Sequence, residues 1–250
     1  MTSIKRVISI SSVIFVPIFL LSATLTWAIN HPFLYDRGFD KFQVAERSGI
    51  TEADLRIIGK ELRTYFNSSS EPLEIRTHIK STEIILFNSQ EIAHMFDVKR
   101  LIWGVYATLL LTTILLAAAI TIGFLRKGRA VGIPIYKWLF AGSTLTVAMI
   151  SCIGLLCLTA FDAIFLIFHR ISFTNDLWRL NPSTDYLIKL FPRDFWFEST
   201  IVVAVIVITM AAFISVISGL TLLIQSRAKD QAPDTDYDPT IRKSIRTTSG

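Results

Sequence analysis

The sequence of 250 residues has few charged side chains and very little cysteine. Only 18% of its residues are charged, whereas soluble domains carry about 25%, and its mean hydropathy is +0.51. This composition excludes an ordinary soluble domain and indicates a membrane protein. The two cysteines, Cys152 and Cys157, lie in one apolar block on different faces of the expected helix. They therefore predict neither a disulfide nor a metal pair.

Several motifs that carry chemistry are also missing. The sequence contains no Walker or dinucleotide-binding glycine motif, no internal repeat, no H-E-x-x-H zinc motif and no G-x-S-x-G nucleophile elbow. No serine or cysteine can be named as a nucleophile, so an acyl-transfer enzyme of this sequence would take its nucleophile from the substrate. We predict no cofactor and no metal site.

What the sequence does contain is four apolar blocks, each long enough to cross a bilayer, which takes roughly 20 helical residues. They cover residues 7–29, 101–125, 138–168 and 200–224. The first block could be a signal peptide, but it is long for one and no A-x-A cleavage site follows, so we favour a retained anchor. The third block is longer than a bilayer requires and is expected to tilt or to project outward.

Basic residues predict how the four spans are oriented. They gather in the N-terminus, the link between the second and third blocks, and the tail: Lys5, Arg6, Arg126, Lys127, Arg129, Lys137, Arg227, Lys229, Arg242, Lys243 and Arg246. The positive-inside rule then places both termini in the cytoplasm, and this topology explains the net charge of +5 better than nucleic-acid binding does. Lys99 and Arg100 oppose this assignment, but the long segment before them weakens the rule there.

The predicted fold is an α-helical membrane protein: a four-transmembrane-helix bundle with a small extracytoplasmic α/β cap and an interfacial aromatic segment. Residues 1–225 would form a single integral membrane domain, with an outer cap at 30–98 and an outer loop at 169–199. Residues 226–250 are short of apolar side chains and would form a disordered cytoplasmic tail.

The cap segment shows both helix and strand patterns. TEADLRIIGKELRTYF predicts an amphipathic helix capped by Thr51. Its apolar face is formed by Leu55, Ile58, Leu62 and Tyr65. LEIRTHIK and EIILF read as two strands of a β-hairpin. Asn88 and Glu91 then predict the capped start of a helix that runs directly into the second span.

The shorter outer segment is rich in aromatic side chains. These are Phe173, Trp178, Tyr186, Phe191, Phe195, Trp196 and Phe197. Such residues suit the headgroup zone of a membrane, and two interpretations stay open: a belt that anchors the bundle, and a groove that binds lipid. Pro182 and Ser183 predict a short interfacial helix that ends near Pro192.

Two histidines are placed for acid–base work at the outer surface. His94 lies one helical turn from both Glu91 and Asp97, and His169 ends the third block. A histidine can take and give a proton near neutral pH, although two of them could also bind a metal. Asp162, the only charged residue inside the four blocks, is either functional or a carboxylate that is protonated or paired with an arginine.

Two strings of residues resemble a family of bacterial four-span membrane proteins, long catalogued as a domain of unknown function, that includes the lipoprotein intramolecular transacylases. The first consists of Leu34, Tyr35, Gly38, Phe39, Phe87, Asn88, Glu91, His94, Met95, Asp97, Val98 and Lys99. The second consists of Phe168, His169, Phe173, Asn175, Trp178, Pro182, Asp185, Leu187, Ile188 and Pro192. The resemblance extends over residues 7–224, almost the whole chain except the tail.

The resemblance implies a reaction on lipoproteins at the outer face of the cell membrane. An acyl chain would move from the diacylglyceryl group of an N-terminal lipoprotein cysteine to the α-amine of that cysteine, which gives the lyso form. The family's motif histidines correspond to His94 and His169, and these would act as base and as acid or oxyanion stabiliser, in an order that stays open.

The resemblance also implies roles for neighbouring residues. Asp97 and Asp185, and more weakly Glu91, would orient the two histidines. Asp162 is a further supporting residue. The substrate would be bound by Tyr35, Asn175 and Trp178. The competing function is a non-enzymatic membrane sensor or assembly factor whose cap binds lipid or a protein partner. Histidines that converge on one small site would favour the enzyme, and histidines more than about 10 Å apart would favour the binding protein.

Overall fold

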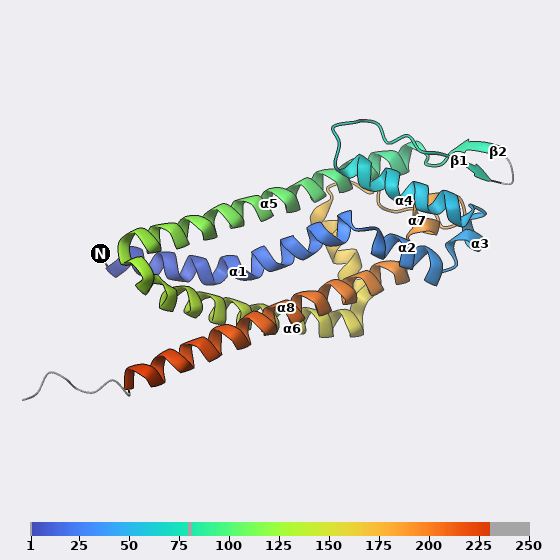
Figure 1. Cartoon of the computed structure of the whole chain (residues 1–250). Coiled ribbons are helices and arrows are strands. Elements are labelled where there is room, and N and C mark those ends of the chain that lie inside the picture. The colour runs from blue at the N-terminus through green and yellow to red at the C-terminus, as the bar shows by residue number, and fades with distance from the viewer. Residues whose placement is uncertain (1, 80–81, 231–250) are drawn as a thin grey trace, which may run out of the picture.

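The structure is a computed structural model that describes residues 2–79 and 82–230. Four long helices form its body: α1 (Thr2–Asn30), α5 (Ser89–Lys127), α6 (Gly132–Ser172) and α8 (Arg193–Asp230). Each is long and apolar enough to cross a membrane, which confirms the predicted four-span bundle (Figure 1). The chain is a multi-pass membrane protein.

Close packing between the spans depends on small side chains. In α6, the Cβ of a residue larger than glycine at Gly142 would lie 2.6 Å from the Val16 side chain and 2.9 Å from the Val13 carbonyl oxygen of α1. Val16 packs with Val207 and Ala211 of α8 in a small buried cluster. Because lipid is as apolar as these side chains, close van der Waals contact rather than the hydrophobic effect holds the spans together.

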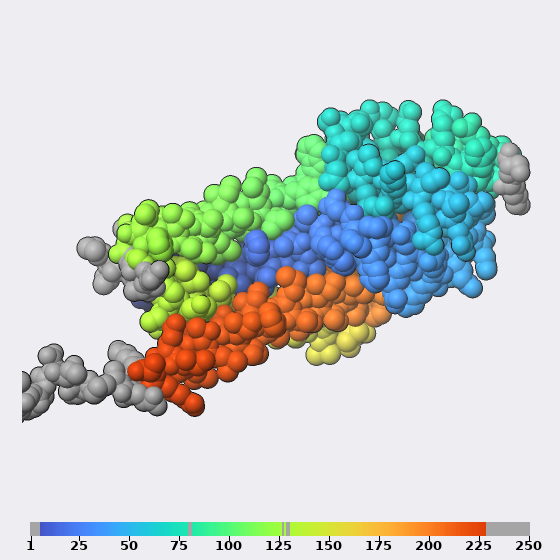
Figure 2. Space-filling view, viewed as in Figure 1, coloured from blue at the N-terminus to red at the C-terminus, as the bar shows by residue number. Residues whose placement is uncertain are grey.

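The cap consists of short elements gathered at one end of the bundle, where the molecule is broadest (Figure 2). Their order is α2 (Pro32–Lys41), α3 (Val44–Ser48), α4 (Glu52–Phe66), β1 (Arg76–Ile79), β2 (Thr82–Ile85) and, from the second outer segment, α7 (Tyr186–Leu190). The sequence analysis did not predict α2 or α3. The predicted hairpin is confirmed, with β1 and β2 antiparallel and Arg76 opposite Ile85.

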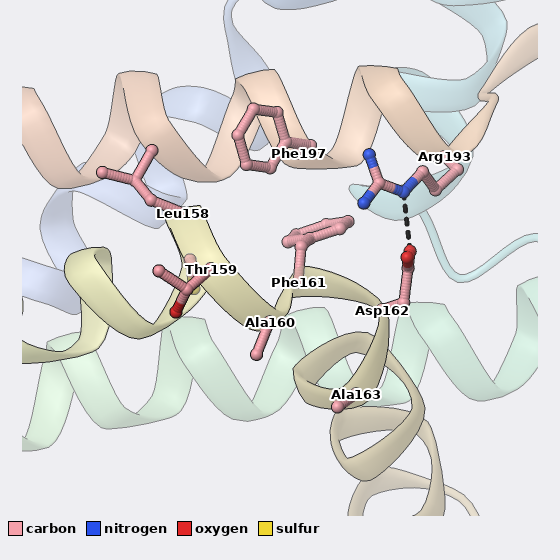
Figure 3. A pocket seen from close by; sticks show the side chains of 9 residues that line it. Leu158, Thr159, Ala160, Phe161, Asp162, Ala163, Arg193 and Phe197 are labelled. Carbon is pink, nitrogen blue, oxygen red and sulfur yellow. Dashed lines mark hydrogen bonds and ion pairs between the residues drawn. The ribbon is translucent and has the colours of Figure 1, made fainter.

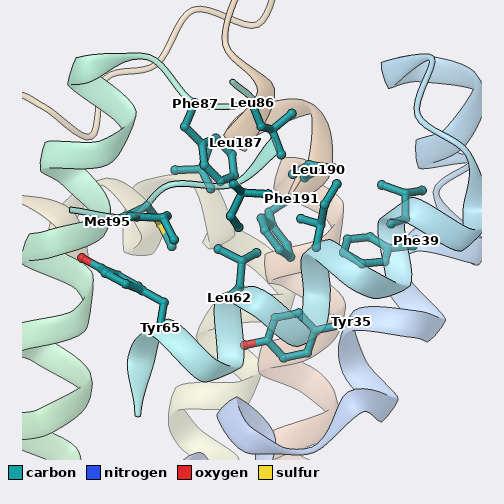
Figure 4. Packing of buried hydrophobic residues seen from close by; sticks show 14 of the residues in the cluster. Tyr35, Phe39, Leu62, Tyr65, Leu86, Phe87, Met95, Leu187, Leu190 and Phe191 are labelled. Carbon is teal, nitrogen blue, oxygen red and sulfur yellow. The ribbon is translucent and has the colours of Figure 1, made fainter. Parts of the chain in front are cut away.

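A hydrophobic core holds the cap together without disulfides. Figure 4 shows Leu62 of α4 beside Leu190 and Phe191, which come from the second outer segment. The predicted face of α4 is confirmed, since Leu55, Ile58, Leu62 and Tyr65 are all buried. The predicted N-cap is confirmed as well, because the Thr51 hydroxyl accepts a hydrogen bond from the Asp54 N–H. The two outer segments therefore form one cap.

The helix α5 runs without a break from the cap into the membrane, as predicted. Its first turn is closed by a capping box, in which the Asn88 side chain accepts from the backbone and the Glu91 side chain accepts from the Asn88 N–H. About two turns further along α5, Lys99 is buried, and its ammonium group donates to the Ser70 carbonyl at 2.8 Å and to Glu71 at 2.9 Å. Lys99 thus anchors a cap loop, which explains why a basic residue stands on this side.

The long helix α6 changes direction before it reaches the cap. Ala160 has non-helical backbone angles (φ −141°, ψ 38°), which break the helix into two parts, and Figure 1 shows the second part diverging from α8. This kink is how the extra length of the third block is accommodated. His169 lies near the end of the second part.

Three boundaries differ from those expected. The link between α5 and α6 is largely helical, with a short 3₁₀ turn at Gly128–Val131. The helix α7 begins at Tyr186 rather than at Pro182, because Pro182–Thr184 forms a turn. The helix α8 continues past Ser226 to Asp230, and the rest of the expected disordered tail, 231–250, lies outside the described residues.

Candidate functional site

His94 and His169 meet where α5 and α6 enter the cap. Their ring centroids lie 6.3 Å apart, and the planes of the two rings are inclined by 32°. Both side chains are buried, with 7% and 8% of their surface exposed. The distance is well inside the limit of about 10 Å that separates an acid–base pair from two independent residues.

The hydrogen bonds of the two rings differ. His169 Nδ1 lies 2.7 Å from the Phe165 carbonyl oxygen, which can only accept, so Nδ1 carries the proton. In the neutral ring, Nε2 then has a free lone pair. His94 Nδ1 is buried, and within residues 2–79 and 82–230 it has no hydrogen-bond partner. One ring is therefore fixed as a proton acceptor at Nε2, and the other has a polar atom left for a ligand.

Aromatic rings wall the histidine pair. Phe173 lies 5.2 Å from the His94 ring and 5.7 Å from the His169 ring, and Trp178 lies 4.9 Å from His169. Two imidazolium charges at this separation, shielded from water, would repel each other strongly, so the pair is most stable with at least one ring neutral. A neutral ring can begin an acid–base cycle by taking a proton.

Asp97 and Asn175 lie beside the pair. The Asn175 amide donates to the Asp97 carboxylate at 2.8 Å, and the Trp178 indole N–H donates to the Asn175 carbonyl oxygen at 3.0 Å. Asp97 and Asn175 also border a cavity of about 610 Å³ whose walls are mainly apolar, with Ile92 and Phe96 among them. Neither histidine lines this cavity.

Glu91 and Asp185 hold the segments around the site together. Glu91 accepts from the backbone N–H groups of Leu187 at 2.6 Å and Asn88 at 2.8 Å. Asp185 accepts from the Asn181 N–H at 2.7 Å and from the Asn88 side chain at 3.1 Å. Burial alone would raise the pKa of the Asp185 carboxyl, but these hydrogen bonds hold it below its usual range. The two carboxylates join the start of α5 to the loop that carries Trp178.

Two other predicted site residues lie away from the histidines. Tyr35 is buried in the cap core, where its ring contacts Phe191 and its hydroxyl donates to the Ile29 carbonyl at 3.0 Å (Figure 4). Asp162 lies beyond the kink of α6 and forms an ion pair with Arg193 at 2.6 Å. This is the arginine pairing that the sequence analysis left open for Asp162.

Sequence reasoning missed Phe165, whose carbonyl fixes the tautomer of His169 and whose ring lies 4.3 Å from it. The signal was present, because Phe165 precedes His169 by one helical turn. Of the residues in the second string, Phe173 and Trp178 lie against the His169 ring, and Asn175 donates to Asp97.

Comparison with known proteins gives one family and one fold. Residues 10–196 match the family described as lipoprotein intramolecular transacylase Lit. An uncharacterized protein of Aquifex aeolicus is 28% identical over 120 residues, which cover 48% of this chain, and the chain spans only half the length of that relative.

Solved structures of Lit from Bacillus cereus resemble 91% of this chain. One, described as a membrane integral lipoprotein intramolecular transacylase, superimposes with a TM-score of 0.75 at 18% identity and covers 91% of this chain and 100% of its own. A structure of the same protein with one histidine substituted gives a TM-score of 0.71 at 17% identity, over 91% and 96% of the two chains. At such identities the likeness shows the fold alone.

Proposed function

Because this chain belongs to the lipoprotein intramolecular transacylase family, we propose that it transfers an acyl chain within a diacylglyceryl-modified lipoprotein, using His94 and His169 for the proton transfers. The acyl chain would move from a glyceryl ester to the α-amine of the N-terminal cysteine of the lipoprotein. The product would be an N-acylated lyso-lipoprotein. No cofactor enters this reaction, since the substrate supplies both the nucleophile and the ester.

The observation that carries the proposal is the convergence of the two histidines. They come from two separate helices, α5 and α6, and their ring centroids lie 6.3 Å apart. In the proposed complex, the substrate amine would contact one ring and its own ester carbonyl the other. Convergence favours an acid–base pair over a sensor that reads pH through independent histidines.

The first step would be loss of a proton from the α-amine. This amine has a pKa near 8 and is mostly protonated at neutral pH, so it needs a base before it can attack. We assign this role to His169, because the hydrogen bond from Nδ1 to the Phe165 carbonyl leaves Nε2 as the acceptor. The freed amine nitrogen then forms a bond to the ester carbonyl carbon, and the carbonyl oxygen becomes an oxyanion.

The second step would be collapse of the tetrahedral intermediate. We assign stabilisation of the oxyanion to His94, whose buried Nδ1 has a hydrogen-bonding position to offer. After the attack the nitrogen carries two hydrogens and a positive charge, and it releases one of these protons to solvent. The bond between the carbonyl carbon and the glyceryl oxygen then breaks, and the glyceryl oxygen takes the proton held by His169. One ester is lost, one amide and one hydroxyl are formed, and both histidines return to their starting state.

Asp97 would support His94 electrostatically. It stands one turn further along α5, where its negative charge favours positive charge on the His94 ring as that ring donates to the oxyanion, and Asn175 holds its carboxylate in place. Asn175, which lines the cavity, and Trp178, which donates to Asn175, would contact the substrate, and the cavity has room for an acyl segment or the first residues of the lipoprotein. Tyr35 and Glu91 would act only by building the cap.

The site would face the outside of the cell membrane. The first and last described residues lie at the end of the bundle opposite the cap, as expected for an even number of spans (Figure 1). The positive-inside rule assigns that end to the cytoplasm. The cap and both histidines would then lie where a mature lipoprotein exposes its N-terminal cysteine.

The test is a reaction with a doubly labelled substrate. A diacylglyceryl lipopeptide with heavy acyl chains is mixed with one whose peptide is heavy, and the products of the purified protein in lipid are analysed by tandem mass spectrometry. We expect N-acyl lyso products in which each heavy chain stays with its original light peptide. Exchange of labels between peptides would contradict intramolecular transfer, and an unchanged substrate would contradict the transacylase assignment.

A further inference from the structure

A second polar site lies on the side of the bundle, away from the histidine pair. It is a cavity of about 250 Å³ at the kink of α6, bordered by Leu158, Phe161 and Asp162 of α6 and by Arg193 and Phe197 of α8. Figure 3 shows Arg193 and Asp162 facing each other across its mouth. Asp162 precedes His169 by two helical turns, about 10 Å, so this cavity is separate from the proposed reaction site.

The residues beside the cavity are of the kind found at a membrane surface. Arg193 is the first residue of α8, where the chain leaves the cap and enters its last span, and Trp196, in the next turn, is 43% exposed. Exposed tryptophan beside charged residues is typical of the headgroup zone. The cavity therefore opens to lipid headgroups.

The charges at the mouth are arranged as an open cluster. Arg193 Nε lies 2.6 Å from Asp162, and its Nη1 lies 3.1 Å from Asp194, so one cation stands between two anions. The guanidinium also lies 5.1 Å from the Phe161 ring and 5.7 Å from the Phe197 ring. Asp162 is 79% exposed and Arg193 is 49% exposed, which leaves both groups able to bind a further partner.

The broken helix adds polar backbone to the same place. Ala160, with φ −141° and ψ 38°, breaks the regular geometry of α6 at the cavity, and a break of this kind exposes backbone polar groups more than a regular helix does. A polar, charged cavity of this kind does not suit an acyl chain. It suits a headgroup that brings its own hydrogen-bond donors and acceptors.

We propose that this cavity binds the headgroup of a phospholipid that carries both a phosphate and a primary ammonium group, as phosphatidylethanolamine does. The phosphate would bind the Arg193 guanidinium, and the ammonium group would bind Asp162. A volume of 250 Å³ holds about eight non-hydrogen atoms if each takes the roughly 30 Å³ of a liquid water molecule, which is the size of a phosphoethanolamine group.

Charge balance selects this headgroup over an anionic one. Arg193, Asp162 and Asp194 together carry one net negative charge, which repels a headgroup with a phosphate and no amine, such as phosphatidylglycerol. An ammonium group on the ligand turns this repulsion into attraction. The acyl chains would lie along α6 and α8, whose lipid-facing side chains include Leu158 and Val205. This lipid site is independent of the proposed transacylase reaction.

The test measures lipid retention on the purified full-length protein by native mass spectrometry in a mild detergent. Phosphatidylethanolamine and phosphatidylglycerol with identical acyl chains are added separately. We expect the wild type to hold the first lipid about tenfold more tightly, as one charge-assisted contact provides. Asp162→Asn should remove this preference, and Arg193→Gln should weaken binding of both lipids.

The matched control is Arg37→Gln. Arg37 forms a similar exposed ion pair with Glu198 of α8 at 2.7 Å but does not line the cavity, so its substitution should leave the lipid preference unchanged. If Arg193→Gln is not recovered folded, Arg193→Lys takes its place. A lysine keeps the charge but cannot form paired hydrogen bonds to a phosphate, so this variant should bind less lipid. Equal binding of the two lipids by the wild type, or an equal loss in Arg37→Gln, would overturn the proposal.

Discussion

The Glu91 carboxylate accepts a hydrogen bond of 2.6 Å from the Leu187 N–H, and this contact joins the start of α5 to α7. Glu91 is 1% exposed, and its other oxygen accepts from the Asn88 N–H at 2.8 Å. Through these two bonds a single side chain holds together the two outer segments that supply His94 and Trp178. The cap is therefore sensitive to this residue although it does not touch either histidine ring.

Replacing Glu91 should loosen the cap. Glu91→Ala leaves the buried Leu187 N–H without an acceptor and opens the capping box, which should cost about 2–4 kcal/mol of unfolding free energy. Hydrogen exchange followed by mass spectrometry should show faster exchange over α7. Glu91→Gln keeps one acceptor and should lie between wild type and alanine, while Ser89→Ala, in the same turn, should match wild type. Unchanged exchange in Glu91→Ala would contradict this role.

Asp185 should make the stability of the cap depend on pH. Its hydrogen bonds to Asn181 and Asn88 hold the pKa of the carboxyl below its usual range, so the charged form is stabilised by folding. The resulting gain in the free energy of unfolding is complete above the pKa of the unfolded state, about 3.9. It is lost as the pH falls through the lower pKa of the folded state.

The pH dependence can be isolated by comparison with Asp185→Asn. This variant should be less stable than wild type at pH 7, and the difference in Tm should shrink as the pH is lowered below about 4. Thermal unfolding in detergent, followed by near-ultraviolet circular dichroism, measures the difference. A gap between the two proteins that stays constant with pH would refute the assignment.

Substitution by alanine should change the stability of the protein differently at two glycines of α6. At Gly142 a Cβ would lie 2.6 Å from Val16 and 2.9 Å from the Val13 carbonyl oxygen, so α1 and α6 would have to separate. At Gly154 nothing lies within 4 Å of a Cβ. Gly142→Ala should lower the unfolding free energy by about 1–3 kcal/mol, as overpacking does, whereas Gly154→Ala should not destabilise the protein. Equal Tm values in detergent would contradict the close approach of α1 and α6.

The sequence predicted the spans, the hairpin, the capped start of α5 and the face of α4, because each follows from local pattern. Hydropathy over a full span and periodicity within a helix need no knowledge of distant residues. The same pattern led from Asn88 and Glu91 to the correct start of α5. The helices α2 and α3 were missed because they are short, and because their stability comes from packing against α4 and α7.

The candidate site was predictable only in part, because it is made by contacts between distant segments. The strings around His94 and His169 marked both residues, but only the fold brings the two rings to 6.3 Å. Glu91 was expected beside His94, since both face one side of α5, yet its carboxylate turns to the Leu187 N–H. The backbone of α7 supplies the hydrogen bond to that carboxylate, and α7 is too distant in the sequence for a local pattern to reveal it.

The central claim is that His94 and His169 act as one pair, and the rate of product formation tests it most directly. Purified His94→Gln and His169→Gln are assayed by mass spectrometry for the N-acyl lyso form of a diacylglyceryl lipopeptide, with His78→Gln on exposed β1 as the matched control. We expect each site variant to lose about 10²–10⁴-fold in rate, and the double variant to lose little more, while His78→Gln retains wild-type activity. Product formation at the wild-type rate by either site variant, correctly folded, would contradict the account.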